Sequence, residues 1–251
     1  MDAYRNLTII KNRGNEYHEV VDPVALETKV RITVQGEELL SLSCTPVMVR
    51  ELITGFLVTE KILPDIASAT AVRIQYGDDI FAEIPAGLME TRTALCRSLG
   101  GLTAGSEEKA RIKIQGGLSL SASSLKSLCR DFQNRSELFR LTGCFHSAAV
   151  SDGTKILAFA EDIGRHNAVD KVIGYTLLNN ILLEGMIMLV SCRVSSDIIT
   201  KCLRWNIPIL ASRAAPTALS IRIAEESGMT LAGFVRGDSM NLYTHSRRIR
   251  G

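Results

Sequence analysis

The chain has 251 residues, of which 46% are hydrophobic, and its 29 basic and 27 acidic side chains give a net charge of +2. This composition predicts a globular protein of one large or two smaller domains, and it gives no reason to expect a nucleic acid or a membrane surface as a partner. No apolar run approaches the ~18 residues that a spanning helix needs, and residues 1–14 are too polar for a signal peptide, so we expect a cytoplasmic protein.

The first half of the chain mixes strand and helix patterns. Residues 8–10 resemble a strand, and apolar runs on both sides of residues 35–37 predict a hairpin. Residues 47–63 have the apolar spacing of a helix. A second hairpin is expected around residues 77–79, where a Gly-Asp-Asp turn separates two short apolar runs.

The pattern weakens after the second hairpin. Residues 85–106 are glycine-rich and show no periodicity, so we expect a mobile loop there. Residues 123–141 then have the spacing of a helix with a serine cap. We assign residues 1–137 to an N-terminal α+β subdomain and residues 138–251 to a second domain.

The second half is more regular. A hairpin-like pair is followed by an alternation of strands and helices with short joins, which predicts an α/β domain with a mostly parallel sheet covered by helices. The pair is expected at residues 145–150 and 155–160, the strands at 186–190, 208–211 and 231–235, and the helices at 195–205 and 216–227.

An arginine follows each of four successive strands: Arg165, Arg193, Arg213 and Arg236. In a parallel sheet these strand ends share one edge, where helix N-termini present free N–H groups to anions. Guanidinium groups bind phosphate in a bidentate manner, so we expect a phosphate-binding edge. Pairing of the arginines with acidic neighbours is the alternative.

Residues 161–174 connect an apolar strand to an amphipathic helix, and this connection contains charged side chains, an imidazole and glycines. His166 and Asp170 are four residues apart and can share one helix face. A well-capped helix with a solvated first turn is the structural alternative, and a phosphoester-binding enzyme with His166 and Asp170 as acid and base is a functional one. Walker-type and G-x-G-x-x-G loops are missing from the sequence, which disfavours common nucleotide hydrolases and dinucleotide oxidoreductases.

Cys144 and His146 lie two residues apart on an expected strand. His146 lacks a glutamate two residues later and the chain has no P-C-x-x-C, so we expect no bound catalytic zinc. The two side chains could still form a thiolate–imidazole or metal pair. Filling of the core by Cys144 is the alternative.

Five segments of the chain, taken in order, closely resemble the formate dehydrogenase accessory family, FdhD. They are residues 142–149, 161–171, 191–196, 211–217 and 233–244, and residues 45–60 also resemble this family. The resemblance implies a cytidine-deaminase-like α/β/α second domain and a homodimer. It also implies a sulfur carrier that takes persulfide sulfur from a cysteine desulfurase and passes it to the molybdenum bis(guanine dinucleotide) cofactor before insertion into formate dehydrogenase.

Under this resemblance the cofactor is a bound client, GDP is its expected mimic, and the protein has no tightly bound metal of its own. The expected cofactor contacts combine the segment implied by the family with the phosphate-binding edge. They are Phe234, Val235, Arg236, Gly237, Asp238, Ser239, Asn241, Arg165, His166, Asp170, Arg193, Ser212 and Arg213.

The chain departs from the family at the sulfur-carrying cysteines. Family members usually carry a C-x-x-C pair on which a persulfide forms, whereas Leu99 and Leu102 stand at the equivalent positions here. Cys96 is the expected catalytic cysteine if sulfur transfer persists, since Arg97 beside it could lower the pKa of its thiol.

Cys144 and Cys192 are the alternatives, because they lie in other segments closer to the expected cofactor edge, where Arg193 could play the same part. If no cysteine serves, the alternative is a cofactor-binding chaperone that has lost sulfur transfer. An exposed thiol at the sheet edge that carries the four arginines would favour a sulfur carrier. If all the cysteines are buried, a protein that only binds the cofactor is favoured.

Overall fold

The computed structural model describes residues 1–88, 112–114 and 118–251. The first elements are β1 (Tyr4–Arg13), β2 (Glu16–Ala25), β3 (Thr28–Val34), β4 (Glu37–Cys44), α1 (Val49–Thr59), α2 (Ile66–Thr70), β5 (Arg73–Gln75) and β6 (Ile80–Ile84). The later elements are β7 (Leu120–Ser121), α5 (Ala122–Asn134), α6 (Glu137–Thr142), β8 (His146–Ser151), β9 (Ile156–Asp162), α7 (Arg165–Leu178), β10 (Ile187–Val190), α8 (Ser196–Arg204), β11 (Ile209–Ser212), α9 (Ala218–Ser227), β12 (Thr230–Arg236), β13 (Ser239–Thr244) and β14 (Ile249–Arg250).

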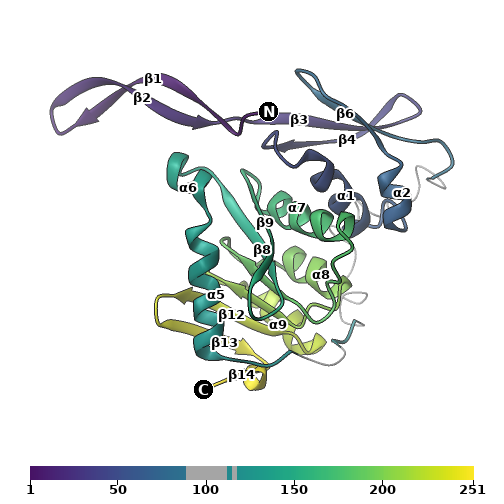
Figure 1. The fold of residues 1–251 in the computed structure, drawn as a ribbon, viewed down its shortest axis with the longest axis vertical. Helices are drawn as coiled ribbons and strands as arrows, with labels where there is room; N and C mark the ends of the chain where they lie inside the picture. The colour runs from purple at the N-terminus through teal and green to yellow at the C-terminus, as the bar shows by residue number, and fades with distance from the viewer. Residues whose placement is uncertain (89–111, 115–117) are drawn as a thin grey trace.

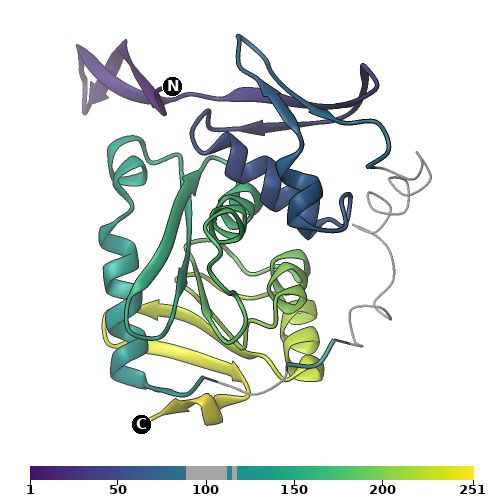
Figure 2. The same ribbon diagram turned by 45° about the vertical axis from the view of Figure 1, so that its right-hand side comes forward.

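β1 and β2 form a hairpin that projects from the body of the protein (Figures 1 and 2). We call this hairpin the arm. Its strands pair along their full length, from Tyr4 opposite Ala25 to Arg13 opposite Glu16. The sequence pattern predicted only residues 8–10 of it as a strand.

The first domain has a four-stranded sheet in the order β4-β3-β6-β5. Both predicted hairpins are confirmed, because β3 pairs antiparallel with β4 and β5 pairs antiparallel with β6. α1 packs its apolar residues, among them Leu52, Ile53 and Leu57, against buried residues of this sheet such as Ile32 and Ile80. Packing of this apolar helix face fixes α1 on the sheet.

The second domain is built on a six-stranded sheet in the order β13-β12-β11-β10-β8-β9. β10, β11 and β12 are parallel neighbours. β8 is antiparallel to both β10 and β9, so β9 runs in the same direction as β10. Four of the six strands therefore end at one edge, as the sequence predicted, while β8 and β13 begin there.

Helices cover both faces of this sheet, which gives a mixed α/β fold (Figure 2). Alternate residues of each strand face opposite sides: Met188 and Val190 contact the core shared with α7, α8 and α9, whereas Ile187 and Leu189 contact α5. Within the described residues, no helix is long and apolar enough to cross a membrane.

The single helix expected over residues 123–141 is two helices, α5 and α6. α5 begins at the cap Ser121, whose side chain accepts a hydrogen bond from the Ser124 amide. Its apolar face packs on the second sheet, although the expected boundary at residue 137 grouped it with the first domain. Most of the expected mobile loop, residues 89–106 with Cys96, Leu99 and Leu102, lies outside the described residues.

Candidate functional site

The four arginines lie along the edge of the second sheet at which β9, β10, β11 and β12 end. We call this the arginine edge. Arg165 is the first residue of α7, Arg193 and Arg213 follow β10 and β11, and Arg236 ends β12. Arg193, Arg213 and Arg236 are exposed and Arg165 is half-buried. None of the four makes a salt bridge within the described residues. The alternative that they neutralise nearby carboxylates has no support there.

Phe234 and Arg236 form one end of this edge. The Arg236 guanidinium carbon lies 5.6 Å from the centroid of the Phe234 ring, and Arg236 Nε donates a 2.8 Å hydrogen bond to the Arg213 carbonyl. The Phe234 amide donates to the Ala214 carbonyl at 3.2 Å. The end of β12 is thus held against the loop after β11, with an exposed aromatic ring and a cation side by side. Such a pair can stack on a nucleobase.

The Phe234 backbone is in the left-handed region, with φ of 52°. This conformation is strained for a bulky residue and is typical of ligand-binding positions. It coincides with an irregularity in the pairing of β12 with β13 between Gly233 and Arg236. Phe234 is 38% exposed at this position.

The other predicted contacts near β12 differ in accessibility. Gly237, Asp238, Ser239 and Asn241 are exposed in the β12–β13 turn and the start of β13, whereas Val235 is buried in the core. Ser212 is also buried.

The Ser212 hydroxyl is already engaged within the loops after β10 and β11. It donates to the Cys192 carbonyl at 2.7 Å and accepts from the Ala214 amide at 2.9 Å. Ser212 therefore positions these loops through its own hydrogen bonds.

Two helix N-termini at the arginine edge have no side-chain cap. α7 begins after Gly164 and α8 after Ser195, and neither residue caps its helix, in contrast to Thr217 at the start of α9. Arg165 Nε and Ser195 Oγ are buried without a hydrogen-bond partner among the described residues. Unpaired donors at helix N-termini are suited to an anion.

Two imidazoles lie next to these N-termini. Burial lowers the pKa of His146, and Arg165 and Arg193 lower it further. The pKa of His166 is lowered by burial and then by Arg165 and Lys201. Both side chains are therefore neutral near pH 7.

His166 and Asp170 line one cavity of about 260 Å³ between the two domains, as their spacing on one helix face predicted. His166 Nε2 is buried there without a partner in the described part of the chain. Asp170 accepts hydrogen bonds from Lys201 at 2.8 and 2.9 Å and from Thr59 at 2.8 Å, and Lys201 also contacts Glu60 at 2.6 Å. These partners make Asp170 a link between the domains.

Asp162 and Lys171 form a second buried link that the sequence analysis did not identify. Their side chains meet at 2.6 Å and are both fully buried. Asp162 accepts from the Thr45 amide at 3.1 Å, and Lys171 donates to the Thr45 carbonyl at 3.2 Å. The sequence could have pointed to this pair, because Asp162, Lys171 and Thr45 all lie in the segments that resemble the family.

The described cysteines divide into buried and exposed thiols. Burial raises the pKa of the Cys44, Cys129 and Cys202 thiols to about 12 and that of Cys192 to about 11. These four are protonated and inaccessible near pH 7. Cys144 is exposed, which excludes the core-filling alternative for it.

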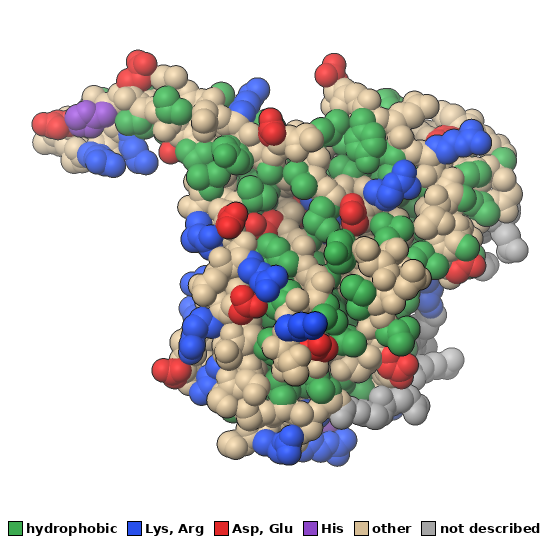
Figure 3. Space-filling view, viewed as in Figure 1, with side chains coloured by type: hydrophobic (Ala, Val, Ile, Leu, Met, Phe, Trp, Pro, Cys, Tyr) green, Lys and Arg blue, Asp and Glu red, His purple; other side chains and the backbone are tan. Residues whose placement is uncertain are grey.

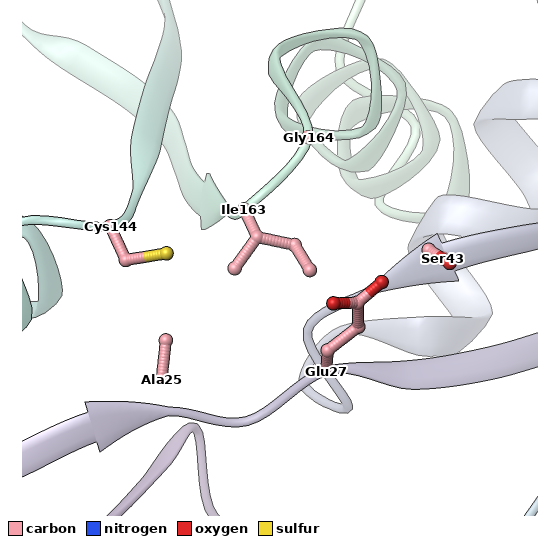
Figure 4. Close-up of a pocket in the computed structure, with 6 residues that line it drawn as sticks. All are labelled: Ala25, Glu27, Ser43, Cys144, Ile163 and Gly164. Carbon is pink, nitrogen blue, oxygen red and sulfur yellow. The ribbon is translucent and has the colours of Figure 1, made fainter.

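Cys144 lies just before β8, and strand register places it at the arginine edge. Its neighbour His146 pairs with Asp162 at the end of β9, and Ala148 pairs with Val190 at the end of β10. The Cys144 side chain points into a pocket of about 370 Å³ with Ile163 on one side and Ala25 on the other (Figure 4). The thiol is therefore accessible at the start of the edge.

Within the residues that the structure describes, no group of three or more His, Cys, Asp and Glu side chains could hold a metal ion. The four arginines and the uncapped helix N-termini are donors, which are suited to an anionic, hydrogen-bonding ligand, whereas Glu27 in the Cys144 pocket and Asp170 in the neighbouring cavity are acidic.

Comparison with known proteins identifies one family. Residues 25–250 match the model of the FdhD/NarQ family. The chain is 33% identical to the sulfur carrier protein FdhD of Geobacillus kaustophilus, over 98% of this chain and 97% of that protein, and 34% identical to that of Wolinella succinogenes, over 99% and 90%. Its structure is similar to a crystal structure of a proposed formate dehydrogenase accessory protein from Desulfotalea psychrophila, with a TM-score of 0.79, 25% identity and coverage of 99% and 100%.

Proposed function

The chain belongs to the FdhD/NarQ family, and on this premise we propose that it is a sulfur carrier that serves formate dehydrogenase. It accepts persulfide sulfur from a cysteine desulfurase and passes it to the molybdenum bis(guanine dinucleotide) cofactor. The cofactor is the client of this reaction. The exposed Cys144 thiol at the arginine edge is the observation that carries the proposal.

The arginine edge fits the client's two kinds of polar group. Pyrophosphate oxygens would accept from Arg165, Arg193 and the free N–H groups of α7 and α8. A guanine base would stack on the Phe234 ring beside the Arg236 guanidinium. The client's nucleotides would then lie along the edge to which Cys144 is adjacent.

Cys144 takes the role that the family gives to its C-x-x-C pair. The Cys144 thiolate would attack the outer sulfur of the donor's persulfide, so that a new S–S bond forms at Cys144 and the donor's S–S bond breaks. The donor cysteine leaves with the electron pair and takes up the proton that Cys144 has lost. Cys96 is the second candidate for this role, and it lies outside the described residues.

The test is mass spectrometry after incubation with a cysteine desulfurase and cysteine. We expect one added sulfur on the peptide that contains Cys144, and loss of this product in Cys144→Ala. Cys129→Ala is the matched control, since Cys129 lies on the buried face of α5 and cannot receive sulfur. Cys96→Ala should leave the product unchanged.

Complementation of a strain without its own accessory protein extends the test to activity. Wild type and Cys129→Ala should support formate dehydrogenase, and Cys144→Ala should not. A persulfide on Cys96 would move the carrier role to that residue. If no persulfide forms, and Leu99→Cys with Leu102→Cys creates the only active variant, the cofactor-binding chaperone becomes the better hypothesis.

A further inference from the structure

The pocket at Cys144 is built by both domains. Its first-domain wall comes from the end of the arm, the link to β3 and the strand β4, and its second-domain wall comes from the residue before β8 and the link between β9 and α7 (Figure 4). The described lining residues are Ala25, Glu27, Ser43, Cys144, Ile163 and Gly164. The volume of about 370 Å³ is in the range of ligand pockets, roughly 300 to 1,000 Å³. A ligand there would contact the thiol and both domains.

Hydrogen bonds hold the two walls of this pocket together. Asn167 Nδ2, in the first turn of α7, donates to the Ser43 carbonyl at 2.8 Å and to Asp162 Oδ1 at 2.9 Å. Asp162 Oδ1 also accepts from the Gly164 amide at 2.7 Å, and the same carboxylate is paired with Lys171. Networks of this kind make the structure around them rigid. The spacing of the walls is therefore set by the protein itself.

Glu27 is the only charged side chain among the described residues that line the pocket. Its carboxylate points into the pocket from the first-domain wall, and the Cys144 thiol points in from the other wall (Figure 4). Glu27 is exposed and forms no salt bridge in the described part of the chain. A molecule that enters therefore meets a negative charge in the same pocket as the thiol.

The arginine edge beside this pocket has the opposite preference. Its arginines and free helix N–H groups are suited to anions, so the pyrophosphates of the client fit there. In the pocket an anion would be repelled by Glu27, whereas a cation would be attracted. Charge can therefore direct the client and the sulfur donor to different sides of Cys144.

The surface next to the pocket is suited to contact with a protein. Ala25, at the end of the arm, lines the pocket, and hydrophobic side chains gather where the arm joins the body (Figure 3). On α6, which contacts β2, Phe139 is 44% exposed and Leu141 is 45% exposed. Exposed apolar surface of this kind marks sites of protein contact. The pocket therefore fits a segment of a donor protein better than a free small molecule.

We propose that Glu27 is a specificity-determining residue, which restricts the pocket to protein sulfur donors that carry a basic side chain beside the persulfide. This inference rests on the proposed function, in which Cys144 accepts the sulfur. Glu27 forms an ion pair with the basic side chain of the donor. It also repels anionic thiols and disulfides, which would otherwise consume the exposed Cys144 thiol. Glu27 itself forms and breaks no bond to sulfur.

Thiol–disulfide exchange with small disulfides of different charge measures this preference. Cystamine carries two ammonium groups, glutathione disulfide is anionic and 2-hydroxyethyl disulfide is uncharged. In each reaction the Cys144 thiolate attacks one sulfur, a new S–S bond forms at Cys144, and the other half of the disulfide leaves as a thiolate. Mass spectrometry of the peptide that contains Cys144 gives the rate at this residue alone. Division by the rate with the uncharged disulfide cancels any change in the fraction of thiolate.

The wild type should react faster with cystamine than with glutathione disulfide. Glu27→Gln should lower the ratio of these two rates at least about fivefold at low salt, since the lost charge acts on the two probes in opposite directions. Glu27→Lys should lower the ratio further. Glu19→Gln is the matched control, because Glu19 lies on β2 roughly 20 Å from Ala25, well beyond the screening length of about 8 Å. It should keep the ratio of the wild type.

Persulfide formation from a cysteine desulfurase tests the donor. Glu27→Lys should slow sulfur transfer to Cys144 at least about tenfold, because like charges then meet, while its reaction with 2-hydroxyethyl disulfide stays within about twofold of the wild type. An unchanged ratio in Glu27→Gln, or a wild type that prefers glutathione disulfide, would overturn the role of Glu27 even if Cys144 acquires its persulfide normally. A wild type with the charge preference but no persulfide on Cys144 would instead overturn the carrier role, and the assignment of the donor with it.

Discussion

Gly55 of α1 and Gly174 of α7 are in backbone contact where the two domains meet. A Cβ built on Gly174 would lie 2.8 Å from the Gly55 nitrogen and 1.9 Å from the Glu51 carbonyl oxygen. A Cβ on Gly55 would lie 1.9 Å from the Asp170 carbonyl oxygen. The helices can approach this closely only because both positions lack a side chain. This crossing fixes the first domain beside the arginine edge.

Alanine at either glycine should therefore destabilise the protein strongly. Since the clash is with backbone, which cannot move aside as a flexible side chain can, Gly55→Ala and Gly174→Ala should each cost at least about 3 kcal/mol in free energy of unfolding. Urea unfolding measures this. Gly77→Ala is the comparison, because its nearest contact would be 3.3 Å, which a shift of a few tenths of an ångström relieves, and it should cost less than about 1 kcal/mol. Equal effects at all three positions would contradict the role of the crossing.

Asp170→Asn should lower the stability of the protein, and its effect on ligand binding should be the smaller one. The substitution leaves the Lys201 ammonium buried with a weaker set of partners, which typically costs about 3 to 5 kcal/mol. Asp170→Leu combined with Lys201→Met should be less destabilising than Asp170→Asn, since Glu60, which loses its contact with Lys201, is partly exposed to water, whereas Asp170→Asn leaves the buried ammonium with weaker partners. Calorimetry with GDP is the second measurement. A folded Asp170→Asn of normal stability that fails to bind GDP would make Asp170 a ligand contact, as the sequence suggested.

The sequence predicted the elements whose local signals agree with the fold. The turn at Gln35-Gly36 and the turn around Gly77 mark the two hairpins, and Gly228 ends α9 in the left-handed conformation. The arm was mostly missed because polar residues and Pro23 interrupt the alternation in residues 16–25. β13 was missed because it is an edge strand defined by pairing with β12 and carries little alternation of its own.

The gathering of the four arginines at one sheet edge was predicted, because strand direction alone brings them there. Periodicity could not show that Asp170 turns toward Lys201, since that contact joins α7 to α8 and to α1 of the other domain. The exposure of Cys144 was equally hidden, because it depends on the strand starting two residues later, at His146. Contacts between distant segments, which follow from the packing of whole domains, decide both.

Acidification should destabilise the protein through His146 and His166. Both pKa values are lowered by burial and by nearby cations, so the unfolded chain binds protons in a range where the folded chain does not. The free energy of unfolding then falls as the pH drops below about 6.5, by at most about 1.4 kcal/mol per pH unit for each histidine.

Urea unfolding between about pH 7.5 and about pH 5.5 checks this slope. His146→Gln with His166→Gln should be less sensitive to acid than the wild type. Glu161, whose pKa burial raises, acts in the opposite direction and is present in both proteins, so the difference isolates the histidines. An unchanged slope in the double variant would show that the imidazoles are not responsible.

GDP should bind at the arginine edge with an affinity that falls as salt is added. Arg213→Ala and Arg236→Ala should each weaken binding by about 1.5 to 3 kcal/mol, the range for a charge-assisted hydrogen bond, which is roughly 10- to 150-fold. Arg73→Ala in β5 of the first domain is the control and should have no effect. Calorimetry measures all three. If both edge variants bind GDP as the wild type does, the nucleotide site is elsewhere.

Phe234 should show a trade-off between stability and nucleotide binding. Glycine adopts the observed φ of 52° without strain, whereas alanine retains the strain, and both remove the ring that stacks beside Arg236. Phe234→Gly should therefore be more stable than Phe234→Ala by about 1 kcal/mol. Both variants should bind GDP more weakly than the wild type, by about 1 to 3 kcal/mol for a lost stacking contact. Urea unfolding and calorimetry on the same pair separate the two effects, because backbone strain alone would change stability and leave GDP affinity unaltered. Wild-type affinity in both variants would mean that the strained backbone serves the packing of β12 and has no part in nucleotide binding.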